Sequence, residues 1–274
     1  MYLSVNIPRP IHIKNLYTAF KAQFAKDYYF DGEAHDFWEM IFILDGNVGA
    51  TANEKVYLLN KGQVIFHSPM EFHKIWAEKG TKPTVLIISF GTETMPDMAS
   101  QVFHLIQENI DEAEEILKLI QENFEIDDYK VISLKENKEI EANMIVNRLE
   151  NLILSILKND IASNIKYTST SAKNYYNIVK VLEKNIDKNL TINEIAQLCH
   201  MSPHNLRKTF YKFTGIGVVS YFNQLKVKKA IHMLQNDFNV KEVSYALGFE
   251  NQNYFSTFFK RITGKSPSDY KKSF

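Results

Sequence analysis

LTINEIAQLCHMSPHNLRKTFYKFTG (190–215) and FNVKEVSYALGFENQNYFSTFFKRITG (238–264) are two copies of one sequence pattern. The first halves align at an offset of 48 residues, pairing Leu190, Ile192, Glu194 and Ile195 with Phe238, Val240, Glu242 and Val243. The second halves align at an offset of 49, pairing Leu206, Phe210 and Gly215 with Phe255, Phe259 and Gly264. The added residue falls in the connection, where two packed helices tolerate an insertion. We therefore predict two homologous helix-turn-helix units, over 191–215 and 239–264.

The start of the first helix in each copy has a capping signal. Thr191 stands three residues before Glu194, which is the spacing of a capping box. Asn239 stands three residues before Glu242 and gives a weaker version of the same signal. A short helix is expected to follow each signal.

The second helix of each copy is the candidate recognition helix, meaning the helix that enters a groove of DNA. In the first copy it begins at Ser202-Pro203, an N-cap followed by proline, and ends at Gly215. Apolar residues recur at helical spacing, so the side chains between them face outward. The outward residues are His204, Asn205, Arg207, Lys208 and Tyr211 in the first copy, and Asn251, Gln252, Asn253, Ser256, Thr257 and Lys260 in the second.

Residues 217–235 join the two copies and have apolar residues at helical spacing from Tyr221 to Leu234. One linking helix is expected here, and it would fix the orientation of the two units. If both recognition helices lie on one face about 34 Å apart, one chain reaches two successive major grooves.

The charges of the chain are divided unevenly along its length. The formal net charge is zero, with 32 Lys and Arg against 32 Asp and Glu. Residues 1–172 hold 16 basic and 25 acidic side chains, and residues 173–274 hold 16 basic and 7 acidic ones, so the net charges are −9 and +9. A basic C-terminal part favours a polyanionic partner because neutralised phosphates release counterions. The alternative is two solvated surfaces that attract each other.

The segment 190–274 closely resembles the DNA-binding domain of AraC-type transcription regulators. The resemblance rests on IAQLCHMS (195–202), LRKTFYKFTG (206–215) and VSYALGFENQNYFSTFFKRITGKSPSDYKK (243–272), with Tyr221, Ala230 and Leu234 between them. It implies double-stranded DNA as a partner and base contacts near the start and middle of each recognition helix. The residues expected to contact DNA are His204, Asn205, Arg207, Lys208, Asn251, Gln252, Asn253 and Thr257.

Two positions depart from the pattern of this family. The turn glycine of the family is His200 in the first unit, which predicts an unusual backbone conformation or a differently built turn. The small alanine that usually follows Val243 is Ser244. Neither departure changes the expected fold.

The N-terminal part consists of short β-like runs broken by turn signals from about residue 36 to residue 90. This pattern predicts a double-sheet barrel, whose mouth is a common place for a small ligand. HDFWEMIFILDG (35–46) and KGQVIFHSPMEFH (61–73) resemble the cupin-like sensor domain of many AraC-type regulators. Alternation along the strand from His35 lets His35 and Glu39 point together into the barrel.

Three uses of these side chains stay open. A pocket for an organic effector would be lined by His35, Glu39, His67, His73 and Trp76. Cupins that bind metal often use two histidines one residue apart, then a glutamate and a further histidine, but here Phe37 stands at the second histidine position beside His35, Glu39 and His73. Buried histidines bonded to neighbours, with Trp76 as packing, are the third interpretation. We expect an effector pocket and no metal ligand, cofactor or catalytic residue.

Residues 98–123 and 136–162 are expected to form two helices. The second helix has a stripe of apolar residues at alternating spacings of four and three, namely Ile145, Leu149, Leu152 and Ile156. The stripe either pairs with a second chain or packs on the barrel of its own chain. The family resemblance favours a homodimer.

The expected fold is an α+β multidomain chain. A cupin-like effector-sensing β-barrel takes residues 1–95, a helical dimerisation or linker segment takes 96–172, and an all-α DNA-binding domain with two helix-turn-helix units takes 173–274. A stretch rich in Ser, Thr, Asn and Lys, 163–174, marks the last boundary.

The expected function is that of a sequence-specific transcription regulator controlled by a small-molecule effector, and not that of an enzyme. The alternatives are a constitutive DNA-binding regulator whose β domain only dimerises, and a metal cupin enzyme fused to a DNA-binding module. No apolar run approaches the roughly 20 residues that span a bilayer, and the first residues lack the layout of a secretion signal. The single cysteine, Cys199, cannot form an internal disulfide. We therefore expect a cytoplasmic protein without a membrane partner.

Overall fold

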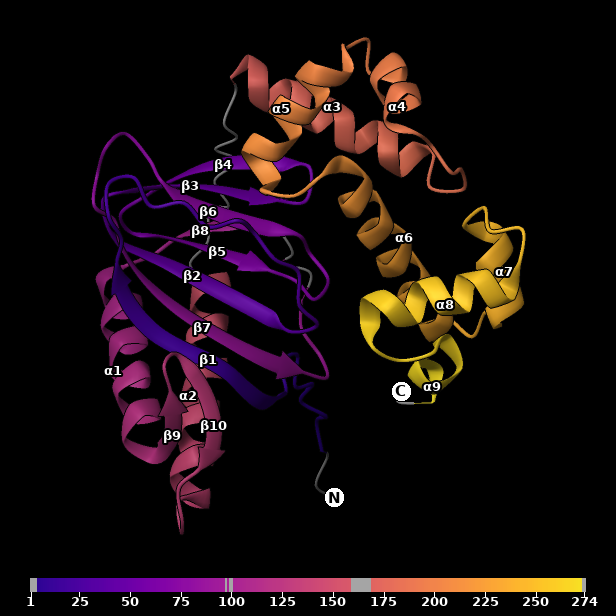
Figure 1. Ribbon diagram of the computed structural model, residues 1–274. Coiled ribbons are helices and arrows are strands. Elements are labelled where there is room, and N and C mark those ends of the chain that lie inside the picture. The colour runs from indigo at the N-terminus through magenta and orange to yellow at the C-terminus, as the bar shows by residue number, and fades with distance from the viewer. Residues whose placement is uncertain (1–3, 97, 99–100, 159–168, 273–274) are drawn as a thin grey trace. The chain divides into compact units, whose positions relative to one another are not determined.

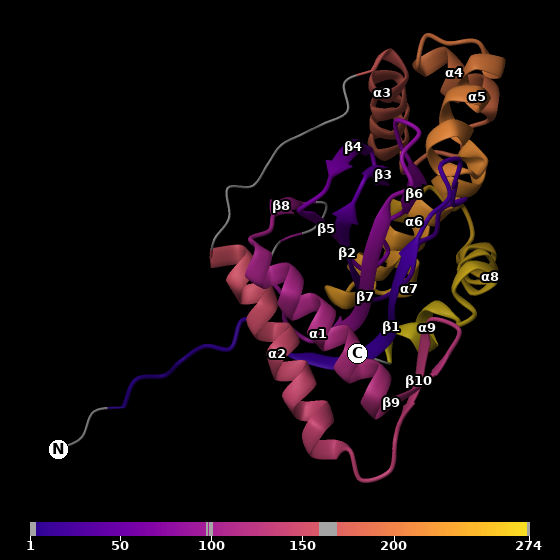
Figure 2. The ribbon, with the colours of Figure 1, turned by 90° about the vertical axis from the view of Figure 1, so that its left-hand side faces the viewer.

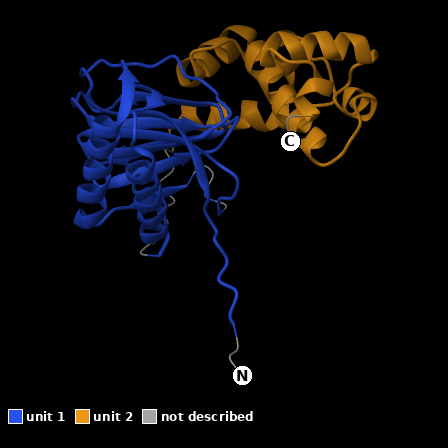
Figure 3. Cartoon of the chain, turned by 90° about the horizontal axis from the view of Figure 1, so that it is seen from below, with its two compact units in different colours: residues 1–167 blue, residues 168–274 orange. Residues whose placement is uncertain are grey.

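The computed structural model describes residues 4–96, 98, 101–158 and 169–272 (Figure 1). The chain divides into two compact units, residues 1–167 and 168–274 (Figure 3). Of the predicted boundary segment 163–174, the part up to residue 168 lies outside the described residues. Because residues 168–172 carry no charge, the net charges of −9 and +9 hold for these two units. The expected β-rich N-terminal domain and helical C-terminal domain are confirmed.

The first unit contains two antiparallel sheets within the described residues. The larger has the strand order β8 (Val102–His104), β5 (Gln63–His67), β2 (Trp38–Asp45), β7 (Thr84–Thr92), β1 (Ile13–Gln23), β10 (Lys130–Leu134) and β9 (Phe124–Asp127). The smaller has the order β4 (Lys55–Asn60), β3 (Asn47–Ala52) and β6 (His73–Ala77).

Strand β2 shows how the larger sheet buries both of its faces. Successive side chains of a strand point to opposite sides, so Met40 and Phe42 share one core while Ile41 and Ile43 share another. The first core also contains residues of two helices, α1 (Gln107–Asn123) and α2 (Glu139–Lys158), which cover that face (Figures 1 and 2). The second core contains residues of both sheets.

The middle segment differs from the expectation of helices alone. Helices α1 and α2 are present, but β8, β9 and β10 also fall within residues 96–172 and belong to the larger sheet. Strand β8 pairs with β5, and β10 pairs with β1 through Thr18 and Lys130. These strands are short and partly polar, so their periodicity is weak, and the partners of β8 and of β10 in the larger sheet, β5 and β1, lie far away in the sequence. The segment therefore completes the β unit.

The apolar stripe of α2 packs on its own unit. Ile145, Leu149, Leu152 and Ile156 are at most 2% exposed and belong to the core beneath the larger sheet. The interpretation of this stripe as a pairing surface between chains is therefore wrong, because its side chains are already buried. Homodimerisation stays a prediction without this support.

The second unit is helical throughout its described part. Its helices are α3 (Thr170–Lys184), α4 (Ile192–Leu198), α5 (Pro203–Thr214), α6 (Val218–Gln235), α7 (Val240–Ala246), α8 (Gln252–Thr263) and α9 (Pro267–Lys271). The pairs α4–α5 and α7–α8 are the two predicted helix-turn-helix units, and α6 is the predicted linking helix. Helix α6 packs against members of both pairs.

Both predicted capping boxes are present. The Thr191 hydroxyl accepts a hydrogen bond from the Glu194 N–H, and the Glu194 carboxylate accepts one from the Thr191 N–H at 2.7 Å. Asn239 and Glu242 make the same reciprocal pair at 2.9 and 2.8 Å. Each box satisfies N–H groups that have no partner inside the helix, so the sequence defines where α4 and α7 begin.

The turns of the two units share one left-handed position. His200 has a φ of 55° in the first unit, and Gly248 has a φ of 76° at the equivalent position in the second. The unusual backbone predicted for His200 is therefore confirmed. A Cβ atom on Gly248 would lie 1.9 Å from the carbonyl oxygen of Asp187, so only glycine fits there.

Replacing Gly248 with alanine is expected to lower the free energy of unfolding by about 2–3 kcal/mol, because the added Cβ meets backbone and the left-handed conformation is strained. His200→Gly at the equivalent position is the matched control. It should raise the unfolding free energy by up to about 1 kcal/mol, since relieved strain is partly offset by the greater freedom of the unfolded chain. Urea unfolding followed by circular dichroism measures both, and an unchanged Gly248→Ala variant would contradict the packing described.

Candidate DNA interface and ligand cavity

Helix α5 turns a polar surface outward because its apolar residues are buried. The Ser202 hydroxyl caps the helix by accepting a hydrogen bond from the Asn205 N–H at 3.2 Å, and Gly215 ends it with a φ of 71°. Leu206, Phe210 and Phe213 are at most 1% exposed. The side chains left exposed are those predicted for DNA contact, His204, Asn205, Arg207 and Lys208. Within the described residues neither Arg207 nor Lys208 has an acidic partner, so both cations are available to an anionic ligand.

Helix α8 repeats this arrangement with a less basic surface. Phe255, Phe258 and Phe259 are buried, while Gln252, Asn253 and Thr257 are exposed. Asn251 has a role that the sequence analysis missed: its side-chain oxygen accepts hydrogen bonds from the N–H groups of Asn253 and Tyr254 and caps the helix. Asparagine is among the preferred N-cap residues, and its place just before the helix was the available signal.

Lys226 connects the linking helix to the second helix-turn-helix unit. Its side chain is buried on α6 and donates hydrogen bonds to the carbonyl oxygen of Leu247 at 2.6 Å and to Asn189 Oδ1 at 3.4 Å. The rings of Phe222 and Phe249 lie 5.2 and 5.1 Å from its Nζ atom. Burial lowers the pKa of Lys226 to about 8, against the opposing effect of Asp187. No role for this lysine was predicted from the sequence, because its partners are distant in the sequence.

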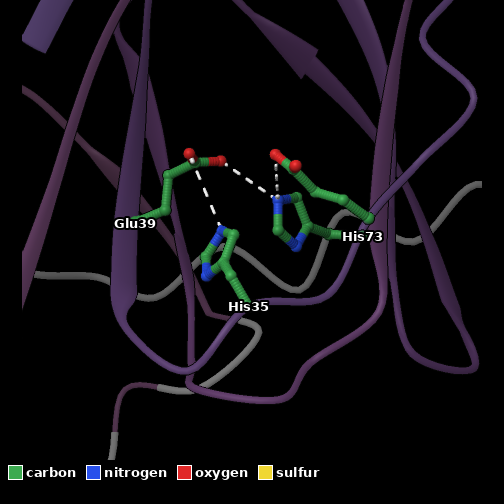
Figure 4. Close-up of side chains that lie close together, drawn as sticks. His35, Glu39 and His73 are labelled. Carbon is green, nitrogen blue, oxygen red and sulfur yellow. Dashed lines mark ion pairs between the residues drawn. The ribbon is translucent and has the colours of Figure 1, made fainter. Parts of the chain in front are cut away.

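In the first unit, the structure brings together three of the five predicted effector residues. Glu39 lies on β2 of the larger sheet, His73 is the first residue of β6 in the smaller sheet, and His35 precedes β2. The Glu39 carboxylate faces both imidazole rings, with His73 Nε2 at 3.2 Å and His35 Nε2 at 3.9 Å (Figure 4). All three side chains are at most 11% exposed.

Glu33 is a fourth member that the sequence analysis missed. One of its carboxylate oxygens lies 3.9 Å from His73 Nε2, and its backbone pairs with that of His73 in an isolated β-bridge. The signal was present: Glu33 stands two residues before His35, the spacing sought for paired histidines, on the opposite side from Phe37. We call Glu33, His35, Glu39 and His73 the His–Glu cluster.

The other ring nitrogen of each cluster histidine is held by a backbone carbonyl. His35 Nδ1 lies 3.0 Å from the carbonyl oxygen of Phe37, and His73 Nδ1 lies 3.0 Å from that of Glu71. A carbonyl oxygen only accepts, so each Nδ1 carries the hydrogen. Both Nε2 atoms are buried without a hydrogen-bond partner in the described structure, including His73 Nε2, whose contact with Glu39 is short but poorly aligned.

The pKa values of the cluster reflect burial and mutual charge. For Glu39, burial opposes ionisation, but His73, His67 and His35 outweigh it and lower the pKa to about 2. For His73, burial opposes the charged form, but Glu39 outweighs it and raises the pKa to about 9. For His35, burial and the neighbouring His73 lower the pKa to about 4. Glu39 is therefore held as a carboxylate.

The cluster borders a cavity of about 500 Å³, a size that suits a small organic molecule. Most of the wall is aromatic or aliphatic, and a few polar groups converge on it. The lining residues are Phe20, Phe24, Tyr28, Phe30, Phe37, Ile41, Ile75, Ile87 and Tyr129, with Thr18, Glu33, Glu39, His73 and Lys130 as the polar ones.

His35 faces Glu39 but is not among the residues that line the cavity. The remaining two predicted effector residues also lie outside this wall. His67 is fully buried, with Nδ1 2.7 Å from a carboxylate oxygen of Glu71, and its ring stacks on that of His73. Trp76 donates from Nε1 to the Glu78 carboxylate at 2.8 Å and covers Gly49, where a Cβ atom would lie 2.0 Å from the indole. The structure thus gives both residues packing partners.

Two family models match the chain, one in each unit. An AraC-like ligand binding domain matches residues 17–135, and a helix-turn-helix domain matches residues 195–273. The chain belongs to the AraC-type family of transcription regulators. The AraC-type resemblance seen in the sequence is therefore confirmed.

Individual relatives of this AraC-type chain are similar over part of their length. The Msm operon regulatory protein of Streptococcus mutans is 30% identical over 47% of this chain and 47% of its own. The bifunctional transcriptional activator and DNA repair enzyme AdaA of Bacillus subtilis is 32% identical over 35% of this chain and 46% of its own. The chain thus spans about half the length of these curated relatives. Among solved structures, ToxT of Vibrio cholerae O395 is 15% identical, covering 93% of this chain and 96% of its own with a TM-score of 0.38.

No helix in the described part of the chain combines the length and the apolar character needed to cross a bilayer.

The buried Lys226 is expected to make the stability of the second unit rise with pH between about 8 and 10.5. Its pKa is lower in the folded chain than in the unfolded chain, so in this range the unfolded chain binds more protons and raising the pH favours folding. Lys226→Met should remove that rise, and Lys229→Met, at an exposed position of the same helix, should keep it. Urea unfolding at several pH values measures the slopes. Equal slopes in the two variants would contradict the burial of this ammonium group.

Proposed function

We propose that this AraC-type chain regulates transcription by binding double-stranded DNA at specific sequences through α5 and α8. The observation that carries the proposal is the repeated helix-turn-helix unit, whose recognition helices bury their phenylalanines and leave amide, imidazole and basic side chains exposed. These side-chain types bond base edges in the major groove. The net charge of +9 on the second unit supports the proposal, because phosphate neutralisation supplies much of the affinity for DNA.

The first unit, in this proposal, binds a small organic effector in the cavity beside the His–Glu cluster. Its apolar walls and few converging polar groups are typical of ligand pockets. Control of transcription then requires that the effector bind two conformations of the chain with different affinity. The activity that we propose is regulatory and not enzymatic. Because the proposed partner is DNA, we also propose that the chain acts in the cytoplasm.

Selection from random duplex DNA tests the proposed reading of bases. The full chain should enrich two sequence blocks about one helical turn apart. Arg207→Ala should relax one block and Asn253→Ala the other, because each removes side-chain contacts to particular bases, at a cost of about 1–3 kcal/mol of discrimination. Lys265→Ala is the control, an exposed cation expected to weaken binding to all sequences equally. If no sequence is enriched, the proposal fails.

A screen of small organic molecules tests the proposed effector. A ligand of the cavity should raise the melting temperature, with a stabilisation of about 2.7 kcal/mol at 100 times its dissociation constant. The same ligand should change the affinity for the selected DNA. If ligands stabilise the chain but leave its DNA affinity unchanged, the proposal that an effector controls DNA binding fails. The proposal that the chain binds DNA is not affected by that result.

A further inference from the structure

The four ligand atoms of the His–Glu cluster have the spacing of a metal site. One side-chain atom from each of Glu33, His35, Glu39 and His73 lies within 4.8 Å of the others. The short contacts join His73 Nε2 to Glu39 Oε1 at 3.2 Å, His35 Nε2 to Glu39 Oε2 at 3.9 Å and His73 Nε2 to Glu33 Oε1 at 3.9 Å. Atoms bonded to one tetrahedral ion at about 2.0–2.2 Å lie about 3.3–3.6 Å from each other. The distances within the cluster therefore include the range expected for the ligand atoms of a metal ion.

The hydrogen bonds around the cluster prepare both histidines to bind a cation. Each Nδ1 donates to a backbone carbonyl, which fixes the ring and leaves Nε2, the atom that would bind a cation, facing the carboxylates. Metal-binding histidines are usually held this way by a carbonyl or a carboxylate. Both Nε2 atoms are buried and unpartnered in the described structure, and His73 is only 2% exposed.

The Glu39 carboxylate is also held in place by hydrogen bonds. Its Oε2 atom accepts a hydrogen bond from the buried hydroxyl of Ser89 at 3.0 Å, and Thr18 bonds Ser89 at 2.6 Å. This chain of hydroxyl groups holds one carboxylate oxygen, so the other stays directed at His73. Hydrogen-bonded carboxylates of this kind support the ligands of metal sites.

The residue types of the cluster indicate which class of metal ion it would hold. Two imidazoles and two carboxylates favour first-row transition ions over Mg²⁺ and Ca²⁺, which prefer oxygen ligands alone.

We propose that Glu33, His35, Glu39 and His73 bind one divalent first-row transition metal ion beside the cavity of the first unit. This reverses the expectation of no metal ligand, because Glu33 adds a fourth candidate ligand where the second histidine of the metal-binding pattern is Phe37. The site stands apart from the proposed regulation of transcription, since metal binding is measured without DNA or an effector.

Titration of the chelator-treated full chain with Co²⁺ tests the proposal, followed by visible absorption and by metal analysis after gel filtration. We expect one Co²⁺ per chain, displaced by Zn²⁺. Glu39→Gln and His73→Asn should each weaken Co²⁺ binding by at least about 100-fold, and Glu33→Gln, at a half-exposed position, by about 10-fold. His12→Ala is the matched control, because His12 and Glu93 form an exposed histidine–carboxylate pair elsewhere on this unit.

Circular dichroism of each metal-free variant separates lost ligands from lost folding. If His73→Asn unfolds, the two glutamate variants decide the question, since glutamine keeps the shape of glutamate. The proposal is overturned if the wild-type chain binds no stoichiometric Co²⁺, if folded Glu39→Gln and Glu33→Gln bind it as tightly as wild type, or if His12→Ala abolishes binding.

Discussion

The burial of the apolar faces of α5 and α8 is the constraint on which the second unit depends. Each recognition helix exposes its polar side chains only because its phenylalanines and Leu206 are packed against neighbouring helices. Capping boxes, proline and glycine define where these short helices begin and end. Lys226 then fixes the linking helix to the turn of the second unit. Positioning of the DNA-facing side chains follows from this core.

The first unit holds charged groups in the interior of its β structure. The larger sheet is covered on one side by α1 and α2 and faces the smaller sheet on the other. Glu39 and His73 come from these two sheets and meet between them. Burial alone would neutralise them, but each stabilises the charge of the other. The cavity and the His–Glu cluster are therefore products of one arrangement.

Local signals in the sequence predicted the second unit well. The repeat, the two capping boxes and the strained turn at His200 depend on residues within a few positions of each other. Features that depend on distant contacts were missed, namely the pairing of β8 and β10 with the larger sheet and the burial of Lys226. The packing of the α2 stripe on its own unit was one of two alternatives that the sequence left open. In the candidate cavity, spacing alone placed His35 with Glu39, but Glu33 joined them only through its bridge to His73.

Protection of guanine N7 atoms from dimethyl sulfate tests the central claim most directly, because N7 lies in the major groove. The account predicts that the full chain, bound to a selected duplex, protects two groups of guanines about 10 base pairs apart, on one face of the DNA. Protection of a single group would mean that only one helix-turn-helix unit enters the groove. Binding without any protection would contradict the account, since the recognition helices would then contact only phosphates.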